Sequence, residues 1–148
     1  MLKIAYHPIY KYALPDGHRF PMVKYELLPK YLLEQGICTK DNFFTPEKVS
    51  EAPILKIHTQ DYYQRLIALD IDKKEIRKMG FPLRKELVER GHYIIDGTIK
   101  GCEFALEHGV AMNIAGLNQI IVVNIKVSCE YLLFGTPLNF LIDITVNA

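Results

Sequence analysis

The chain has 148 residues, of which 49% are hydrophobic and 24% are charged, and its formal net charge is +1. This length suits a single domain, and this composition excludes a disordered chain. A net charge so close to zero gives no electrostatic basis for binding nucleic acid or an anionic membrane, so we expect neither partner.

The three cysteines, Cys38, Cys102 and Cys129, are widely separated and include no C-x-x-C pair. They therefore predict neither a disulfide framework nor a zinc knuckle. No window reaches the roughly 18 uninterrupted apolar residues of a membrane span, and the N-terminus does not resemble a signal peptide. We expect a cytoplasmic protein.

The first third of the chain predicts strands separated by a loop and a helix. Residues 2–7 are β-prone, whereas residues 12–21 contain Pro, Asp and Gly and predict a loop. Pro21 suits the first turn of a helix that ends at Gly36, and Pro29 should divide this helix into two pieces. Residues 42–44 form the next strand candidate.

The middle of the chain predicts short helices. Thr45, Pro46 and Glu47 have the residue types of a helix start. Residues 54–58 predict a strand, after which Thr59 should cap a helix, and Asp72 should cap another through a box with Glu75.

The strongest helical pattern begins near His92 or Asp96 and ends at His108 and Gly109. One apolar stripe recurs at spacings of four, three and four, and we expect it to face the core; it consists of Ile95, Ile99, Cys102 and Leu106. The apolar run at 110–115 then predicts a strand covered on both faces, as in a parallel sheet. This alternation predicts an α/β fold.

The composition changes after Gly116. Of residues 117–148, only Lys126, Glu130 and Asp143 are charged. Residues 120–127 and 140–146 have strong β propensity but little polar alternation. We expect residues 1–116 to be one unit and residues 117–148 to be an atypical apolar tail.

Several segments, in order, resemble the N-terminal part of the histone deacetylase superfamily, in its bacterial histone deacetylase-like and acetoin-utilisation branch. They are KIAYHPIY, PDGHRFPMVKYELL, ILKIHTQDYYQRL, RKMGFPL and DGTIKGCEFALEHGVAMNIAG. The resemblance covers residues 1–116 and implies a doubly wound parallel sheet of the arginase/deacetylase type, here incomplete because the family's domain is about twice this length. It also implies zinc-dependent removal of acetyl groups from acetyl-lysine or small acetylated amines.

The chain departs from this family where the catalytic residues should begin. The strand at 110–115 normally continues into Gly-Gly-Thr-His-His-Ala, whose paired histidines move protons beside the zinc, but here Gly116 precedes Leu117, Asn118, Gln119 and Ile120. The family's later Asp-x-His pair, distant Asp and catalytic Tyr have no match either. A catalytic zinc needs about three protein ligands. We therefore expect a truncated relative with no catalytic residues, no metal ligands, no bound cofactor and no activity by itself.

Three explanations of the tail stay open. A frame disruption after the Gly116 codon would make residues 117–148 out-of-frame translation. Alternatively, the chain is a non-catalytic binding or assembly module whose tail supplies added strands, within the chain or between copies that associate through an exposed strand or the tail. In the third explanation, a second chain supplies the zinc ligands that this chain lacks. Only such a complete enzyme would bind an acetylated substrate.

The loop at 12–21 holds the candidate site residues. In the resembled family this loop forms part of the rim of the substrate channel, which makes His18 and Arg19 candidate rim residues. The alternative is a turn at Asp16 and Gly17 with Arg19 paired to a local acid. We expect His58 beside Asp61 to be structural, His92 to be solvated, and Asp70 and Asp72 to form an exposed helix boundary instead of a metal site.

Overall fold

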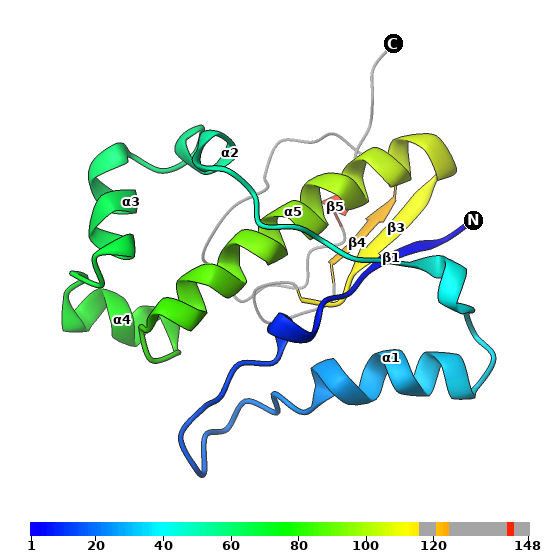
Figure 1. Cartoon of the computed structure of the whole chain (residues 1–148), viewed down its shortest axis with the longest axis horizontal. Coiled ribbons are helices and arrows are strands. Elements are labelled where there is room, and N and C mark those ends of the chain that lie inside the picture. Colours follow the sequence, from blue (N-terminus) through cyan, green and yellow to red (C-terminus); the bar gives the residue numbers. More distant parts are fainter. Residues whose placement is uncertain (116–120, 125–141, 144–148) are drawn as a thin grey trace.

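The computed structural model describes residues 1–115, 121–124 and 142–143, and shows a mixed α/β arrangement (Figure 1). Five strands form one sheet in the order β2-β1-β3-β4-β5. The strands are β1 (Lys3–Ala5), β2 (Phe43–Phe44), β3 (Val110–Asn113), β4 (Ile121–Asn124) and β5 (Ile142–Asp143). The strands expected near residues 2–7, 42–44 and 110–115 are therefore confirmed, as is the α/β class.

The first three strands are parallel and the fourth reverses direction. Strand β1 pairs with β2 and β3 in parallel register, and β4 then pairs with β3 in antiparallel register. Strand β5 runs parallel to β4. Strand β3 thus has a neighbour on each side, and the sheet's edges within the described residues are β2 and β5.

Helices cover both faces of the parallel strands. Consecutive strand residues point to opposite faces. Phe43 lines a cavity of about 210 Å³ together with Pro29 of helix α1 (Lys24–Glu34), whereas the ring of Phe44 lies 4.8 Å from that of Phe104 in helix α5 (Lys85–His108). Asn113 of β3 also faces α5. The helix before β2 and the helix before β3 therefore pack on opposite sides.

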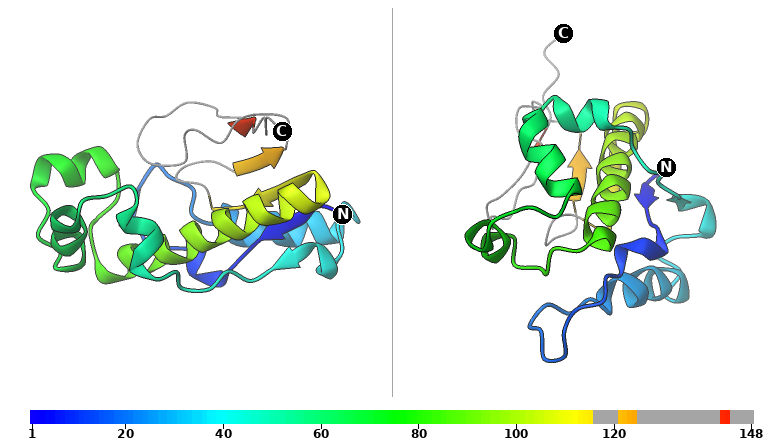
Figure 2. Two further views of the ribbon diagram at one scale, coloured as in Figure 1. Left: turned by 90° about the horizontal axis from the view of Figure 1, so that it is seen from above. Right: turned by 60° about the vertical axis from the view of Figure 1, so that its left-hand side comes forward.

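The short helices begin largely where local capping predicts. Helix α3 (Gln60–Ile67) is capped by Thr59, whose hydroxyl accepts from the Tyr62 amide, and helix α4 (Lys73–Met79) is capped by Asp72. Gly109 ends α5 in the left-handed conformation, with φ of 88°. Helices α3 and α4 project from one end of the sheet layer (Figure 2).

Two predictions for residues 45–58 are wrong. No helix starts at Thr45: residues 45–50 have no regular secondary structure, Pro46 is buried, and the Glu47 amide donates to Asp96 Oδ2 of α5 at 2.7 Å. Helix α2 (Glu51–Leu55) starts instead after Ser50 and includes the first part of the predicted strand at 54–58. Ile54 is buried there, so packing overrides local β propensity.

Pro29 does not divide α1. The helix is continuous, and Pro29 lies inside it with its ring buried. The ring removes one helical hydrogen bond, and its burial against Tyr6 and Phe43 offsets part of that loss. The prediction of two helical pieces is therefore wrong.

Helix α5 begins seven residues before His92, and its expected apolar stripe is not its most buried face. Ile95, Ile99 and Cys102 are half-buried and Leu106 is 59% exposed. The buried positions are mostly small or polar and include Ile94, Asp96, Gly97, Thr98, Gly101 and Ala105. Small residues let a helix lie close to a sheet, which the hydrophobic pattern alone could not indicate.

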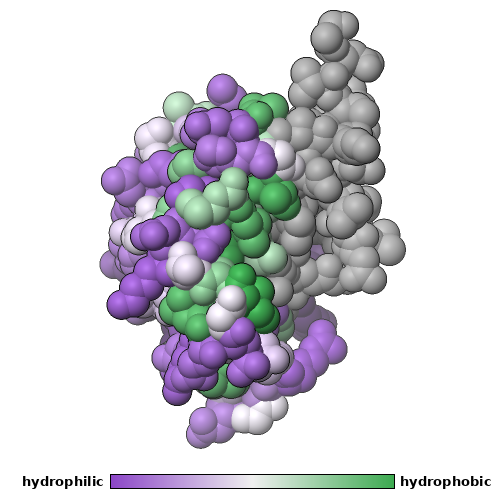
Figure 3. Space-filling view, turned by 90° about the vertical axis from the view of Figure 1, so that its right-hand side faces the viewer, coloured by the Kyte–Doolittle hydropathy of each residue, from purple (hydrophilic) through white to green (hydrophobic). Residues whose placement is uncertain are grey.

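No helix within the described residues is long and apolar enough to cross a membrane. The face that carries the end of α1 and the start of β2 shows a band of apolar side chains between hydrophilic margins (Figure 3).

Candidate functional site

The candidate site lies where the carboxyl ends of β1 and β3 meet. Strand β1 lies between β2 and β3 in the sheet. The connection from β1 to β2 therefore runs toward one edge of the sheet, and β3 is then added on the opposite side of β1. Open α/β sheets bind ligands at the carboxyl ends of the strands beside such a reversal of strand order. We therefore expect functional residues in the loop that follows β1 and in the turn that follows β3.

A buried polar cluster holds the start of this loop. Arg90 of α5 is only 5% exposed, and its Nε donates to the Tyr10 carbonyl at 2.8 Å. Its guanidinium carbon lies 5.3 Å from the centre of the Tyr25 ring. Burial lowers the pKa of Arg90, while contact with the tyrosines opposes that shift. Arg90 fixes the backbone and the ring, and thereby positions the loop.

Asn113, the last residue of β3, connects this cluster to α5. Its Nδ2 donates to the Ile94 carbonyl and to Thr98 Oγ1, each at 3.0 Å, and its Oδ1 accepts from the Ala115 amide at 3.1 Å. These bonds satisfy the side chain and set the course of the chain after the strand. Sequence reasoning missed Asn113, although a polar residue inside an otherwise apolar run was a usable signal.

The hydroxyl of Tyr10 lies beside the same helix and is completely buried. It has no hydrogen bond of ordinary geometry within the described part of the chain, although Asn113 is near it. Burial raises the pKa of Tyr10 far above its usual value, and the charge of Asp96 raises it further. Tyr10 therefore stays protonated and cannot act as a base.

The predicted rim residues differ in their surroundings. His18 Nδ1 accepts from the Phe20 amide at 3.1 Å, so Nε2 carries the proton and donates to the Gly80 carbonyl at 3.2 Å. Its ring also stacks on Phe81 at 5.8 Å. Arg19 is exposed and makes no ion pair or hydrogen bond with any other described residue. The local acid pairing considered for Arg19 is absent from this part of the structure.

Further contacts attach the rim loop to the segment before α5. The Tyr12 hydroxyl donates to the Pro82 carbonyl and accepts from Arg84 Nε, both at 2.7 Å. Arg84 also donates to the Ala13 carbonyl. A cavity of about 270 Å³ lies beside these groups, lined by Ile9, Lys11, Tyr12, Ala13, Arg84 and Glu86. This cavity presents side chains that can bind polar groups, but no paired nucleophile and base.

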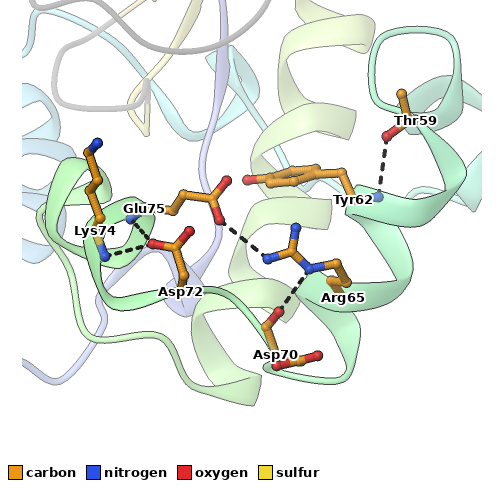
Figure 4. Close-up of polar contacts among 7 residues, drawn as sticks. All are labelled: Thr59, Tyr62, Arg65, Asp70, Asp72, Lys74 and Glu75. Carbon is orange, nitrogen blue, oxygen red and sulfur yellow. Dashed lines mark hydrogen bonds and ion pairs between the residues drawn. The ribbon is translucent and has the colours of Figure 1, made fainter.

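The described residues do not fit a zinc ion. No three His, Cys, Asp or Glu side chains among them lie close enough to bind one metal. Asp72 is occupied with the amides of Lys74 and Glu75, at 2.7 and 2.9 Å (Figure 4). The Asp70 carbonyl accepts from Arg65 Nε at 3.1 Å. Both aspartates belong to the helix boundary, as expected.

His92 and His58 have structural surroundings. His92 is buried, contrary to the expectation of a solvated residue: its Nδ1 donates to the Val88 carbonyl at 2.9 Å, so Nε2 accepts from the Tyr63 hydroxyl at 3.0 Å. The ring of His58 lies 5.1 Å from that of Tyr62, tilted by 31°, and burial lowers the pKa of His58. The residues directly after Gly116, where the family's paired histidines would stand, lie outside the described residues.

No known protein-family model matches the chain. The chain is 35% identical over 113 residues to an uncharacterized protein of Picosynechococcus sp.. The aligned part is 76% of this chain but 38% of that relative, so the chain spans well under half of the relative's length.

Proposed function

We propose that residues 1–116 are the N-terminal part of a histone deacetylase-like domain, and that this chain by itself does not hydrolyse acetyl groups. The observation that carries the proposal is the meeting of β1 and β3 beside an anchored loop, followed in the sequence by Gln119 and Ile120 where the resembled family has its paired histidines. The loop and the strand are present, but the catalytic groups that should follow them are not.

The arrangement of the parallel strands supports an arginase/deacetylase-like, doubly wound sheet. The order β2-β1-β3, with α1 and α5 on opposite faces, matches what we expect at the beginning of such a sheet. The relative from Picosynechococcus is consistent with a larger domain, since more than half of its length lies outside the aligned part. A cytoplasmic location follows from this proposal.

The two proposed rim residues, His18 and Arg19, have different proposed roles. His18 accepts from the Phe20 amide through Nδ1 and holds the loop against Gly80 through Nε2, so its proposed role is to position the rim. Arg19 is exposed beside it and is the residue available to contact an acetylated substrate if the catalytic part were supplied.

Zinc content and hydrolysis of an acetylated lysine substrate, measured on the purified chain, test the proposal. We expect less than stoichiometric zinc and no turnover above the rate without protein, since no described group of side chains can activate a water. Stoichiometric zinc with turnover would overturn it. Sequencing the gene tests the origin of the tail: a Gly-Thr-His-His-like stretch in another frame after the Gly116 codon supports a frame disruption, and its absence removes that explanation.

A second candidate function is a non-catalytic binding or assembly module. The observation that favours it is the antiparallel pairing of β4 along β3, which gives β3 a neighbour from within the same chain. Deleting residues 117–148 separates the two. A structural tail is required for folding, so the shortened chain should lose its cooperative unfolding transition, whereas an out-of-frame tail can be removed with stability unchanged or improved.

A further inference from the structure

Helix α1 has apolar side chains on two opposite faces. Tyr25 and Pro29 are buried on the inner face of the helix. Val23, Leu27 and Tyr31, spaced by four residues, lie on the other side and are 47%, 54% and 55% exposed. We refer to these three residues as the α1 stripe. The helix lies at the lower right of the molecule in Figure 1.

Single exposed apolar residues are common, but three in line on one helix face are a different feature. A helix that is apolar on one side packs on a core, and a helix that is apolar on both sides is found between two layers. The described residues supply only the inner layer.

Charges beside the stripe indicate what the outer layer is. Glu26 and Lys30 lie four residues apart on one flank. When two copies of a helix pack antiparallel about a two-fold axis, the same flank of each copy meets. An axis through the position of Leu28 then places Glu26 opposite the second copy's Lys30, and the reciprocal pair forms by symmetry.

The same axis also fits the apolar residues. It places Leu27 within about 3 Å, along the helix, of the second copy's Leu27, at 1.5 Å per residue. Tyr31 then lies between the second copy's Val23 and Leu27, which is how side chains interlock between packed helices. We propose that the α1 stripe is a self-association surface that joins two copies of this chain through an antiparallel α1 pair.

Glu26 and Lys30 already form ion pairs within the chain, and these would be replaced by the pairs between copies. Glu26 contacts Lys11 at 2.8 Å and Lys30 contacts Glu34 at 3.7 Å, and the side chains in both pairs are about half exposed or more. Exposed pairs of this kind contribute little, so replacing them by pairs between copies has a small cost.

The size of the surface sets the strength of the dimer. Three half-exposed side chains bury roughly 300 Å² per copy and therefore roughly 600 Å² in total, which is half of the total of about 1,200 Å² that stable interfaces reach. The dimer is therefore weak and forms with increasing concentration. It is independent of the proposed deacetylase ancestry, because neither zinc nor the tail takes part.

Sedimentation equilibrium of the full chain, from micromolar to millimolar concentration, tests the proposal. The expected result is a monomer that becomes a dimer within this range. Leu27→Glu should weaken the dimer at least about tenfold, since it places two carboxylates at the axis. Ile57→Glu is the matched control, because Ile57 is 49% exposed outside α1, and its dimer should be unchanged.

Exchanging the charges of Glu26 and Lys30 gives a second test of the dimer that leaves the apolar residues unchanged. Glu26→Lys and Lys30→Glu should each weaken the dimer, and the double variant Glu26→Lys/Lys30→Glu should restore it, since the reciprocal pairs reform with opposite sign. The proposal is overturned if the chain stays monomeric throughout, if Leu27→Glu and Ile57→Glu behave alike, or if the double variant is no better than the single ones.

Discussion

A substitution at Gly97 of α5 tests how closely this helix packs against its neighbours. A Cβ atom added there would lie 2.5 Å from the Tyr10 hydroxyl and 3.0 Å from both Asn113 Nδ2 and Pro46 Cγ. Tyr10 is completely buried, Pro46 is also buried, and Asn113 is held by three hydrogen bonds. None of these groups can move away easily.

Two opposing effects decide what Gly97→Ala does. Alanine in the middle of a helix gains about 1 kcal/mol over glycine. Overpacking a buried site costs about 1–3 kcal/mol. Because three neighbours must shift together, we expect the second effect to exceed the first and the free energy of unfolding to fall by about 1–2 kcal/mol. Gly101, one turn later on the same helix, has no neighbour among the described residues within 4 Å of an added Cβ. Gly101→Ala should therefore be stabilising by up to about 1 kcal/mol.

Urea unfolding followed by circular dichroism measures both variants on the full chain. The difference between them should be roughly 2–3 kcal/mol, with similar slopes. Tyr10→Phe removes the hydroxyl that the new methyl group meets, so Tyr10→Phe/Gly97→Ala should recover part of the lost stability. Equal stability of the two alanine variants, or no recovery in the double variant, would refute the contact at Gly97.

Three further predictions follow from individual hydrogen bonds. Tyr63→Phe leaves the buried Nε2 of His92 without the hydroxyl from which it accepts, and should lower the free energy of unfolding in urea by about 1–3 kcal/mol. Asn113→Ala removes three hydrogen bonds from a residue that is 2% exposed; it should cost about 2–4 kcal/mol, and a loss below 1 kcal/mol would contradict the structure. For Asp72, hydrogen bonds from the Glu75 and Lys74 amides lower the pKa of the carboxyl. The stability it contributes is therefore complete above the ordinary aspartate pKa of about 3.9 and is lost as the pH falls through the lower folded-state pKa. Thermal unfolding of Asp72→Ala should accordingly differ from that of the unaltered chain at neutral pH and approach it in acid, whereas a difference that does not depend on pH would exclude a charged cap.

The sequence by itself determined the features that depend on a few neighbouring residues. Thr59 and Asp72 cap the helices they precede, and Gly109 ends α5 with a positive φ. A capping bond joins atoms two or three residues apart, and a left-handed residue is a local preference for glycine, so neither requires knowledge of the rest of the chain. The strands at β1 and β3 were predictable for a similar reason, because their apolar runs are short and bounded by polar residues.

The tertiary structure decided which faces are buried and which polar residues lie inside. The segment at 45–47 does not begin a helix, because the Glu47 amide donates to Asp96, forty-nine residues later, and no local pattern contains that partner. The buried face of α5 consists largely of Gly, Thr and Ala, whose weak hydrophobicity gives little periodic signal. His92 is likewise buried because Tyr63 supplies its hydrogen bond from another helix. Each outcome depends on a contact between distant segments, and only the folded chain brings those segments together.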